Sequence, residues 1–432
     1  MEERFNMSSQ IKKVVMTLLG VGVLCMVISL VVMYAGASHD AGDHGHGHAV
    51  AHEATQGHSA HGHDTHVAYS AHDVTNRLWS NVLLNTVWFS GIALCGMFFV
   101  AVFGISMSAW QVVIKRVAEA MWPFLIVGLI LTLLVAFLGK DIYHWTHHGL
   151  TIEGDAHFDP ILKAKEWYLN YGGWLTRLII YFVGWIVLSK MIRNNSLKED
   201  QEGGTKWYKS SIKINAAFVV FFAVSSSMWA WDAVMSLDPH WFSTLFGWYL
   251  FASYFTSFFA VITILVIVLK RMGYLSLVND SHLHDLGKWM FAFSLIWTYF
   301  WFSQFMLIWY GNIPEETLWY LKRFNEMPIL TGAVLFINFI CPFLILMTRN
   351  AKRNQYVLLL MAGLILIGHY LDFFVIIMPD GAAHFNGISL LEIGTTLLFA
   401  GGFAMVFFKS LEKASLVPKN HPFLKESIHH EC

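Results

Sequence analysis

The chain contains ten runs of about 20 mainly apolar residues, and no other feature restricts its fold as strongly. A helix of that length crosses the hydrocarbon core of a bilayer. The 432 residues are 56% hydrophobic and only 13% charged, which is the composition of a polytopic membrane protein. The sequence therefore predicts an all-α integral membrane fold with ten transmembrane helices. The runs lie near 14–35, 83–107, 121–139, 173–189, 214–235, 244–269, 289–309, 328–348, 356–378 and 388–408.

Basic residues are distributed unevenly between the two sides of this predicted membrane domain. Most of the 28 Lys and Arg residues flank the runs on the side that holds both termini. Loops rich in Lys and Arg remain in the cytoplasm, so we predict that both termini are cytoplasmic. An even number of spans agrees with this. Arg177 lies inside the fourth run, and the opposite side has only Arg77, Lys140, Lys163, Lys165, Lys322 and Arg323.

Composition and spacing exclude several classes of function. A net charge of -1, with no basic stripe, excludes nucleic-acid binding. None of the four cysteines forms a CxxC pair, so neither disulfides nor iron–sulfur ligation by this chain is expected. Only His369 lies well inside a run, which argues against a haem held by two histidines on facing helices.

The polar stretch 229–247 joins the fifth and sixth runs on the side opposite the termini. Its Asp232 would be costly near the end of a membrane-spanning helix unless a partner compensates its charge. Arg177 in the fourth run is the natural partner if the two helices pack together. We interpret the pair either as a structural ion pair or as part of a site that handles protons.

Two further pairs of ionisable residues have a spacing of three positions within the pair. Asp141 and His144 follow the third run, and His369 and Asp372 lie in the ninth, so each pair is expected to share a helix face. Glu392 lies near the start of the tenth run. Each of these groups has two interpretations: a structural hydrogen bond or ion pair, or a proton relay at a quinone pocket.

Residues at the outer ends of the fifth and seventh runs suggest contacts with partners. In the seventh run, Gln304 is expected to hydrogen-bond between helices, and it is a further quinone-pocket candidate. Pro314 followed by two acidic residues predicts a short surface helix. The candidates for docking a partner are Asp238, His240, Trp241, Tyr310, Glu315 and Glu316.

The loop from 39 to 72 contains ten histidines among Gly, Ala, Asp and Ser. The first interpretation is a low-complexity connector. Weak binding of zinc or copper is the alternative, although the ligands have no fixed spacing. The histidines that would take part are His44, His46, His48, His61 and His63.

A faint internal repeat indicates how the spans are grouped. Trp167-Tyr168-Leu169 precedes the fourth run, and Trp319-Tyr320-Leu321 precedes the eighth. A shift of four helices predicts two four-helix bundles, helices 2–5 and 6–9, with helices 1 and 10 outside them. The corresponding segments are 1–35 (tail and first helix), 36–82 (His-rich loop), 83–235 (first bundle), 236–378 (second bundle) and 379–432 (last helix and C-terminal tail).

Two segments resemble a known family. The stretches Ser-Leu-Asp-Pro-His-Trp-Phe-Ser-Thr at 236–244 and Phe-Ser-Gln-Phe-Met-Leu-Ile-Trp-Tyr-Gly-Asn-Ile-Pro-Glu-Glu-Thr at 302–317, with the ten-helix layout, are similar to the NrfD-like membrane subunits of bacterial alternative complex III. These subunits are related to the membrane subunit of polysulfide reductase. In this family the paralogue beside the iron–sulfur subunit is assigned the quinol site, and the second is assigned scaffolding or proton conduction. The length and His-rich loop of this chain look more like the second, so a structural paralogue and a quinol-binding subunit are both open.

The resemblance implies a multi-pass subunit of a quinol oxidoreductase in the bacterial cytoplasmic membrane, without a redox centre of its own. It implies menaquinol or ubiquinol as the electron donor, hence menaquinone or ubiquinone as the cofactor, with haem c and iron–sulfur clusters on partner subunits. Those partners would be an iron–sulfur subunit, c-type cytochromes, the paralogous membrane subunit, a terminal oxidase and lipids. This chain would contribute the surroundings of a quinone site, proton conduction and scaffolding.

The alternative function is transport across the membrane, for example of metal ions through the His-rich loop. Transporters typically place Gly- or Pro-broken helices at the middle of the membrane. Here the polar residues gather mainly near the outer ends of the runs, which favours the quinol-related function.

Overall fold

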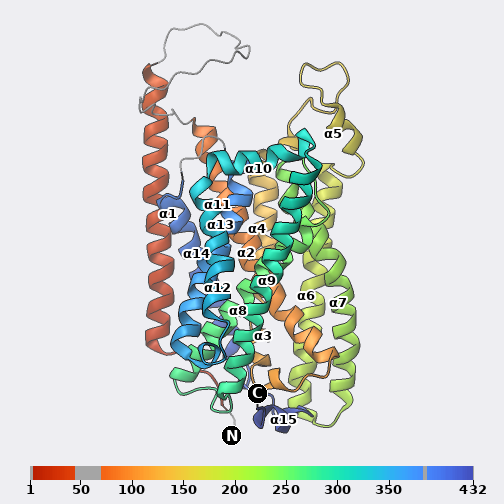
Figure 1. Ribbon diagram of the computed structural model, residues 1–432, viewed down its shortest axis with the longest axis vertical. Coiled ribbons are helices and arrows are strands. Elements are labelled where there is room, and N and C mark those ends of the chain that lie inside the picture. Colours follow the sequence, from red (N-terminus) through yellow and green to blue (C-terminus); the bar gives the residue numbers. More distant parts are fainter. Residues whose placement is uncertain (1–2, 44–69, 383–386, 432) are drawn as a thin grey trace.

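A computed structural model describes residues 3–43, 70–382 and 387–431. This part of the chain is almost entirely helical, with no strand of any length, and ten of its helical segments are long and apolar enough to cross a membrane (Figure 1). The predicted all-α, ten-span fold is therefore confirmed.

Eight of the ten spans form two bundles. The first bundle consists of α2 (Ala71–Ile105), α3 with α4 (Lys115–Glu119 and Phe124–Leu138), α6 (Tyr171–Glu202) and α7 (Lys206–Ala233). The second consists of α8 (Phe246–Arg271), α9 (Asp280–Gly311), the segment α11–η5–α12 (Pro328–Leu335, Phe336–Ile340, Cys341–Ile345) and α13 (Gln355–Gly381). The peripheral spans are α1 (Ser9–Asp43) and α14 (Leu390–Leu411).

The helix contacts follow this grouping. Helices α2, α4, α6 and α7 pack side by side in sequence, and α8 contacts both α9 and α13. The bundles meet where α2 and α7 contact α8, and α2 also contacts α13. The apolar windows of α2 and α8 are each 78% buried, against 17% for α1. Hence α2 and α8 form the centre of the molecule.

Polar caps determine where several spans begin. Ser70 and Asp73 form a capping box that starts α2 at Ala71, well before the apolar run that begins near 83. The additional turns carry Arg77 and Asn81, both buried against other spans. The apolar run alone therefore underestimates the length of α2, because the first turns of this helix are polar although they are partly buried.

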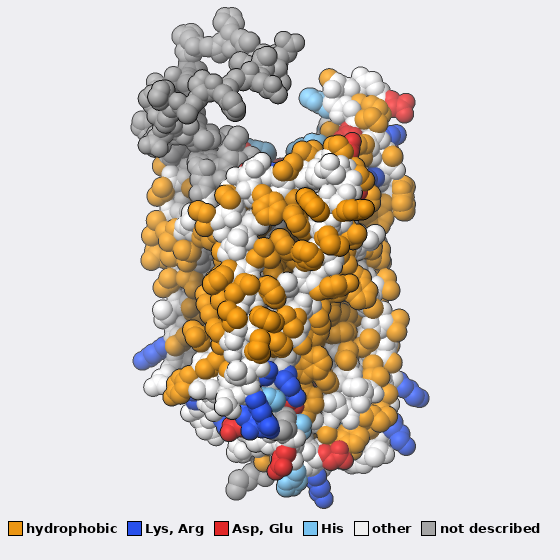
Figure 2. Space-filling view, viewed as in Figure 1, with side chains coloured by type: hydrophobic (Ala, Val, Ile, Leu, Met, Phe, Trp, Pro, Cys, Tyr) orange, Lys and Arg blue, Asp and Glu red, His pale blue; other side chains and the backbone are white. Residues whose placement is uncertain are grey.

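Both termini lie at the same end of the molecule, here called the termini end (Figure 1). In Figure 2, Lys and Arg side chains gather near this end below a broad apolar belt. The opposite end, here called the loop end, carries α5 (Pro160–Lys165) and α10 (Pro314–Glu326), and α10 lies across the bundle. Pro314, Glu315 and Glu316 form the first turn of α10, as the sequence predicts.

The peripheral helices α1 and α14 pack against each other through glycine. A Cβ atom added at Gly394 would lie 2.7 Å from the backbone nitrogen of Met26, and one at Gly22 would lie 2.6 Å from that of Leu398. Such close backbone approach is typical of helix pairs in membranes, where van der Waals packing is the main attraction. The helix α1 is therefore attached mainly through this contact.

We expect Gly394→Leu to separate α1 from α14, because a leucine there would collide with the backbone of α1. The measurement is a disulfide cross-link between cysteines introduced on the two helices, and its yield should fall. Gly402→Leu is the matched control, since a Cβ at Gly402 meets nothing within 4 Å. An equal yield in both variants would contradict the expectation.

The C-terminal segment lies across the termini end and touches both bundles. The backbone N–H of Lys419 donates to Asp200 of α6 (2.8 Å), and Asn279 at the start of α9 donates to the carbonyl of His430 (2.8 Å). Between these points, α15 (Leu424–Ile428) packs on the 3-10 turn Trp110–Val113. The segment therefore ties the bundles together at this end.

Acid is expected to loosen this segment at His421. Burial, with the nearby charge of Lys115, lowers the pKa of His421 to about 3, although Glu119 acts in the opposite direction. The unfolded segment would thus bind a proton that the folded one does not, so stability falls as pH decreases from about 6.5 towards 3. The protection of residues 412–431 against hydrogen exchange, taken relative to the intrinsic exchange rate at each pH, should fall over that range, and less so in His421→Phe. Identical pH profiles would contradict this.

Candidate functional site

An ion pair between a partly exposed arginine and a buried aspartate joins the fourth and fifth spans near the loop end. Arg177 donates through Nη2 and Nε to both carboxylate oxygens of Asp232, at 2.8 and 2.9 Å. Tyr181 donates its hydroxyl to Asp232 Oδ2 at 2.9 Å. Asp232 is fully buried. The predicted pairing of Arg177 with Asp232 is therefore confirmed, and a third donor completes it.

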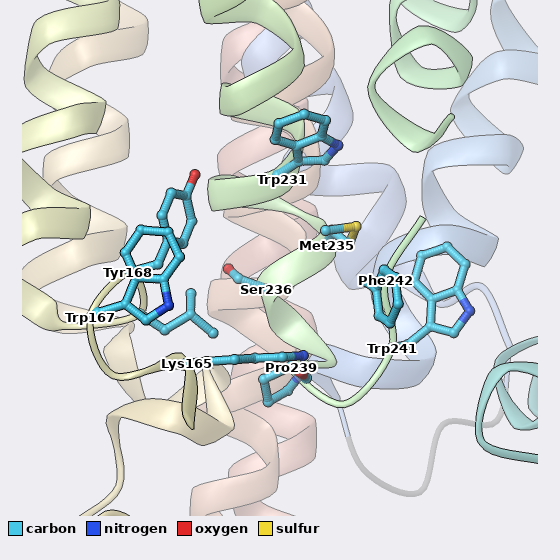
Figure 3. Close-up of a pocket in the computed structure, with 10 residues that line it drawn as sticks. Lys165, Trp167, Tyr168, Trp231, Met235, Ser236, Pro239, Trp241 and Phe242 are labelled. Atoms are coloured by element: carbon cyan, nitrogen blue, oxygen red, sulfur yellow. Dashed lines mark hydrogen bonds between the residues drawn. The ribbon is translucent and has the colours of Figure 1, made fainter. Parts of the chain in front are cut away.

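An aromatic cavity of about 370 Å³ adjoins this ion pair. Figure 3 shows Trp167 and Tyr168 on one side of it, Trp241 and Phe242 on the other, and Trp231 above. The Arg177 guanidinium lies 3.8 Å from the centre of the Tyr168 ring, so Tyr168 belongs to both the cavity wall and the ion-pair cluster. A cavity of this size and lining is typical of small-molecule sites.

Lys165 is the one charged residue among those that line this cavity. Its Nζ donates to the carbonyl of Pro239 at 2.6 Å and lies 5.7 Å from the centre of the Phe242 ring. Burial lowers the pKa of Lys165, although Asp238 and Asp159 act in the opposite direction. Across the cavity, burial together with the charge of Asp232 raises the pKa of Tyr168 to about 12. The cavity thus presents one ammonium group to an otherwise mainly apolar interior.

The turn 238–243 closes the cavity at the loop end. His240 Nε2 lies 2.5 Å from Asp159 Oδ2, which links this turn to the start of α5. Burial would raise the pKa of Asp159, but the contact with His240 and two backbone N–H donors lower it overall. Asp238 accepts the backbone N–H of His240 at 3.2 Å. Both Asp238 and His240 remain accessible enough to contact a partner.

The prediction that Trp241 docks a partner is wrong. The sequence suggested it as a residue that docks a partner, but its side chain is only 3% exposed. It stacks on Trp319 of α10, with ring centroids 4.4 Å apart. Trp241 therefore joins the turn to α10 inside the chain, because burying two indole faces against each other removes a large apolar area from water.

A second buried carboxylate lies in the second bundle. Asp372 of α13 accepts hydrogen bonds from Tyr249 Oη and Ser253 Oγ of α8, and from Trp297 Nε1 of α9. Ser253 Oγ also lies 3.0 Å from His369 Nδ1, so it bridges His369 and Asp372. The predicted pairing of these two residues is thus confirmed, with a hydroxyl between them.

Two buried amides lack hydrogen-bond partners within the described chain. Gln304 is 2% exposed, and neither of its amide atoms is bonded, so the expected interhelical hydrogen bond is not formed. The amide of Asn338 is likewise unbonded, in the π-helical turn Phe336–Ile340 that precedes Pro342. Such turns are frequent at functional sites, and buried amides of this kind are ready to bind water or a ligand.

Glu392 forms an ion pair that the sequence did not reveal. Arg77 of α2 donates to Glu392 Oε1 at 2.9 Å, and Asn81 donates to the same oxygen. Glu392 also completes the capping box of α14 with Ser389. Arg77 was assigned to a loop flank in the sequence, but it is 8% exposed. These contacts support the structural interpretation of Glu392.

A further charged cluster, at the termini end, was not predicted from the sequence. Glu119, fully buried, lies 2.7 Å from Arg193 and 3.6 Å from both Lys115 and Arg116. Arg116 also contacts Asp200 at 2.7 Å. These residues lie at the ends of spans, where charges ordinarily mark exposed flanks, so only the packing of α3 against α6 reveals their burial.

The remaining candidates lie on the loop end or outside the described residues. Asp141 and His144 are exposed and occupy separate 3-10 turns, so the prediction that they share a helix face is wrong: the α-helix ends at Leu138. Tyr310 is 84% exposed and Glu315 is exposed, as docking requires, whereas Glu316 is half-buried. The candidate metal ligands His44, His46, His48, His61 and His63 lie outside the described residues.

One sequence signal could have related the two carboxylate clusters. Asp232 precedes Pro239 by the same seven positions by which Asp372 precedes Pro379, and the two aspartates lie four spans apart. By contrast, nothing local marks Tyr249, Ser253 or Trp297 as partners of Asp372, because their contacts depend on how three helices pack.

No protein-family model and no curated protein matches this chain. Within the described residues, no group of three or more His, Cys, Asp or Glu side chains is placed to hold a metal ion. The function is therefore inferred from two features at the loop end of the first bundle: the aromatic cavity and the Arg177–Asp232 ion pair.

Proposed function

We propose that this chain is a membrane subunit of a quinol-oxidising electron-transfer complex in the bacterial cytoplasmic membrane, with both termini in the cytoplasm. One observation carries the proposal: the aromatic cavity shares Tyr168 with the Arg177–Asp232 cluster. An aromatic wall suits a quinone ring, and ionisable groups beside it suit the proton chemistry of quinol oxidation. The similarity of 236–244 and 302–317 to NrfD-like subunits supports the same function.

Oxidation of a quinol to a quinone releases two protons and two electrons. The electrons pass to iron–sulfur and c-haem centres on partner subunits, while this chain positions the ring and handles protons. Asp232 holds Arg177, which fixes Tyr168 at the cavity wall. His240 and Asp159, at the edge of the same turn, offer protons a route to the outer solvent.

Purification of the intact complex tests this assignment. A tagged chain extracted in mild detergent should copurify with c-type haem and iron–sulfur absorbance that belongs to other polypeptides. A preparation that is intact but contains neither would overturn the proposal, and transport of metal ions by the chain in sealed vesicles would favour the alternative.

Replacing Lys165 tests the cavity itself. In Lys165→Met the quinol oxidation rate at low quinol concentration should fall about tenfold, since loss of one hydrogen bond from a charged donor corresponds to roughly 1.4 kcal/mol. The matched control is Lys163→Met, because Lys163 is exposed and pairs only with Glu166 among the described residues. Equal quinol oxidation rates in the two variants would show that Lys165 does not contribute to the site.

A further inference from the structure

A second aromatic cavity lies at the loop end of the second bundle. It has a volume of about 310 Å³ and lies between the end of α9 and the helix α10. Trp309 and Asn312 contribute from the α9 side, and Thr317, Tyr320 and Phe324 from α10. Its volume is within the range of cavities that bind small organic ligands.

The internal repeat relates this cavity to the first one. Trp167, Tyr168 and Leu169 line the first cavity, and the matching Tyr320 and Leu321 line the second. Each motif also has an arginine stacked on one of its rings: Arg177 on Tyr168, which lines the first cavity, and Arg323 on Trp319, which does not line the second, at 3.4 Å.

Each of these arginines pairs with an aspartate of the last span in its bundle. Arg177 binds Asp232 at the end of α7, and Arg323 lies 2.5 Å from Asp380 at the end of α13. Both bundles therefore have a cavity lined by the motif and an arginine that stacks on a motif ring and pairs with an aspartate, although the two arginines and the two aspartates are not at matching positions of the repeat. The shared Tyr–Leu lining, Tyr168 and Leu169 in one cavity and Tyr320 and Leu321 in the other, is what relates the two cavities.

The lining of the second cavity specifies the kind of ligand. None of the residues that line it is charged, so it offers no cation to a phosphate group. Asn312, Thr317 and Tyr320 provide uncharged hydrogen-bonding groups, and Trp309 and Phe324 provide ring faces. One turn before Ile308, which also lines the cavity, lies the buried and unbonded amide of Gln304. These groups suit an uncharged ring that carries carbonyl or hydroxyl oxygens.

We propose that the second cavity binds the head group of a quinone or quinol, so that each bundle carries one such site. The identity of the ligand rests on the proposed function, whereas the existence of a second site rests on the repeat. Without the ammonium group of Lys165, the second site holds a neutral head group only through uncharged contacts.

Photolabelling of the intact complex with an azido-quinone tests this inference. Labelled peptides should map to the first cavity and also to 305–324, and excess unlabelled quinone should suppress both. Leu321→Trp, which fills the second cavity, should reduce labelling of 305–324 about tenfold and leave the first site unchanged. Leu318→Trp is the matched control, because Leu318 is on the same helix, 62% exposed and outside the cavity.

The outcomes separate the two proposals. Labelling of the first cavity alone would overturn the second site and leave the proposed function intact. Labelling of neither would count against both quinone sites. If a photoactivatable phosphatidylcholine labels 305–324 and the quinone probe does not, the second cavity is a lipid site and the inference fails.

Discussion

Replacing Arg177 with methionine is expected to destabilise the protein by about 3–5 kcal/mol, the usual cost of leaving a buried charge, here Asp232, without its partner. The fully buried Asp232 would lose both of its hydrogen bonds from Arg177. The double variant Arg177→Met/Asp232→Leu should recover most of the lost stability, since replacing both members of a buried pair is often nearly neutral. Thermal unfolding in detergent measures both effects.

Stability and quinol oxidation activity are expected to respond differently in these variants. If the pair positions Tyr168 for quinol chemistry, the double variant will fold but will oxidise quinol slowly. Glu166→Gln is the control, because Glu166 and Lys163 form an exposed pair of the kind that contributes at most about 1 kcal/mol. A stable double variant with full activity would show that the pair is only structural.

Replacing Glu119 with leucine is the second change with a large expected effect. Three cations approach this fully buried carboxylate, and Arg193 depends on it for its closest ion pair. We expect a loss of about 3–5 kcal/mol or more, seen as a smaller monodisperse fraction in size-exclusion chromatography. Glu119→Leu with Arg193→Met should restore part of that fraction.

The control for this experiment is Asp280→Asn, which removes an acid that is largely exposed and lies 3.9 Å from Lys270. It should change stability by less than about 1 kcal/mol. If Glu119→Leu behaves like Asp280→Asn, the buried cluster has no net role in stability.

The sequence predicts those features that depend on local composition. Each span needs about 20 apolar residues, so hydropathy finds all ten. The partners Arg177 and Asp232 could also be proposed, because a charge inside an apolar run needs compensation and only a neighbouring span can supply it. His369 and Asp372 lie one helical turn apart, which places them on one face.

Features that depend on contacts between distant segments could not be predicted. Arg77 and Glu392 are separated by most of the chain; Arg77 lies in a polar stretch that resembles a loop flank, whereas Glu392 lies near the start of the last apolar run. Trp241 was predicted to be an exposed docking residue, because nothing near it in the sequence indicates that it stacks on Trp319. The two cavities likewise require the packed positions of helices and loops, although the motif at 167–169 and 319–321 indicated a repeat.

The glycine-mediated contact between α1 and α14 has a consequence for biosynthesis. Helix α1 packs chiefly on α14, with only a minor contact to α2, although α14 is synthesised much later than α1. At about 5–20 residues per second, roughly 20–80 s of translation separate the two. During that interval the glycine-bearing face of α1 lacks the helix against which it packs, and this contact forms only when α14 has been synthesised.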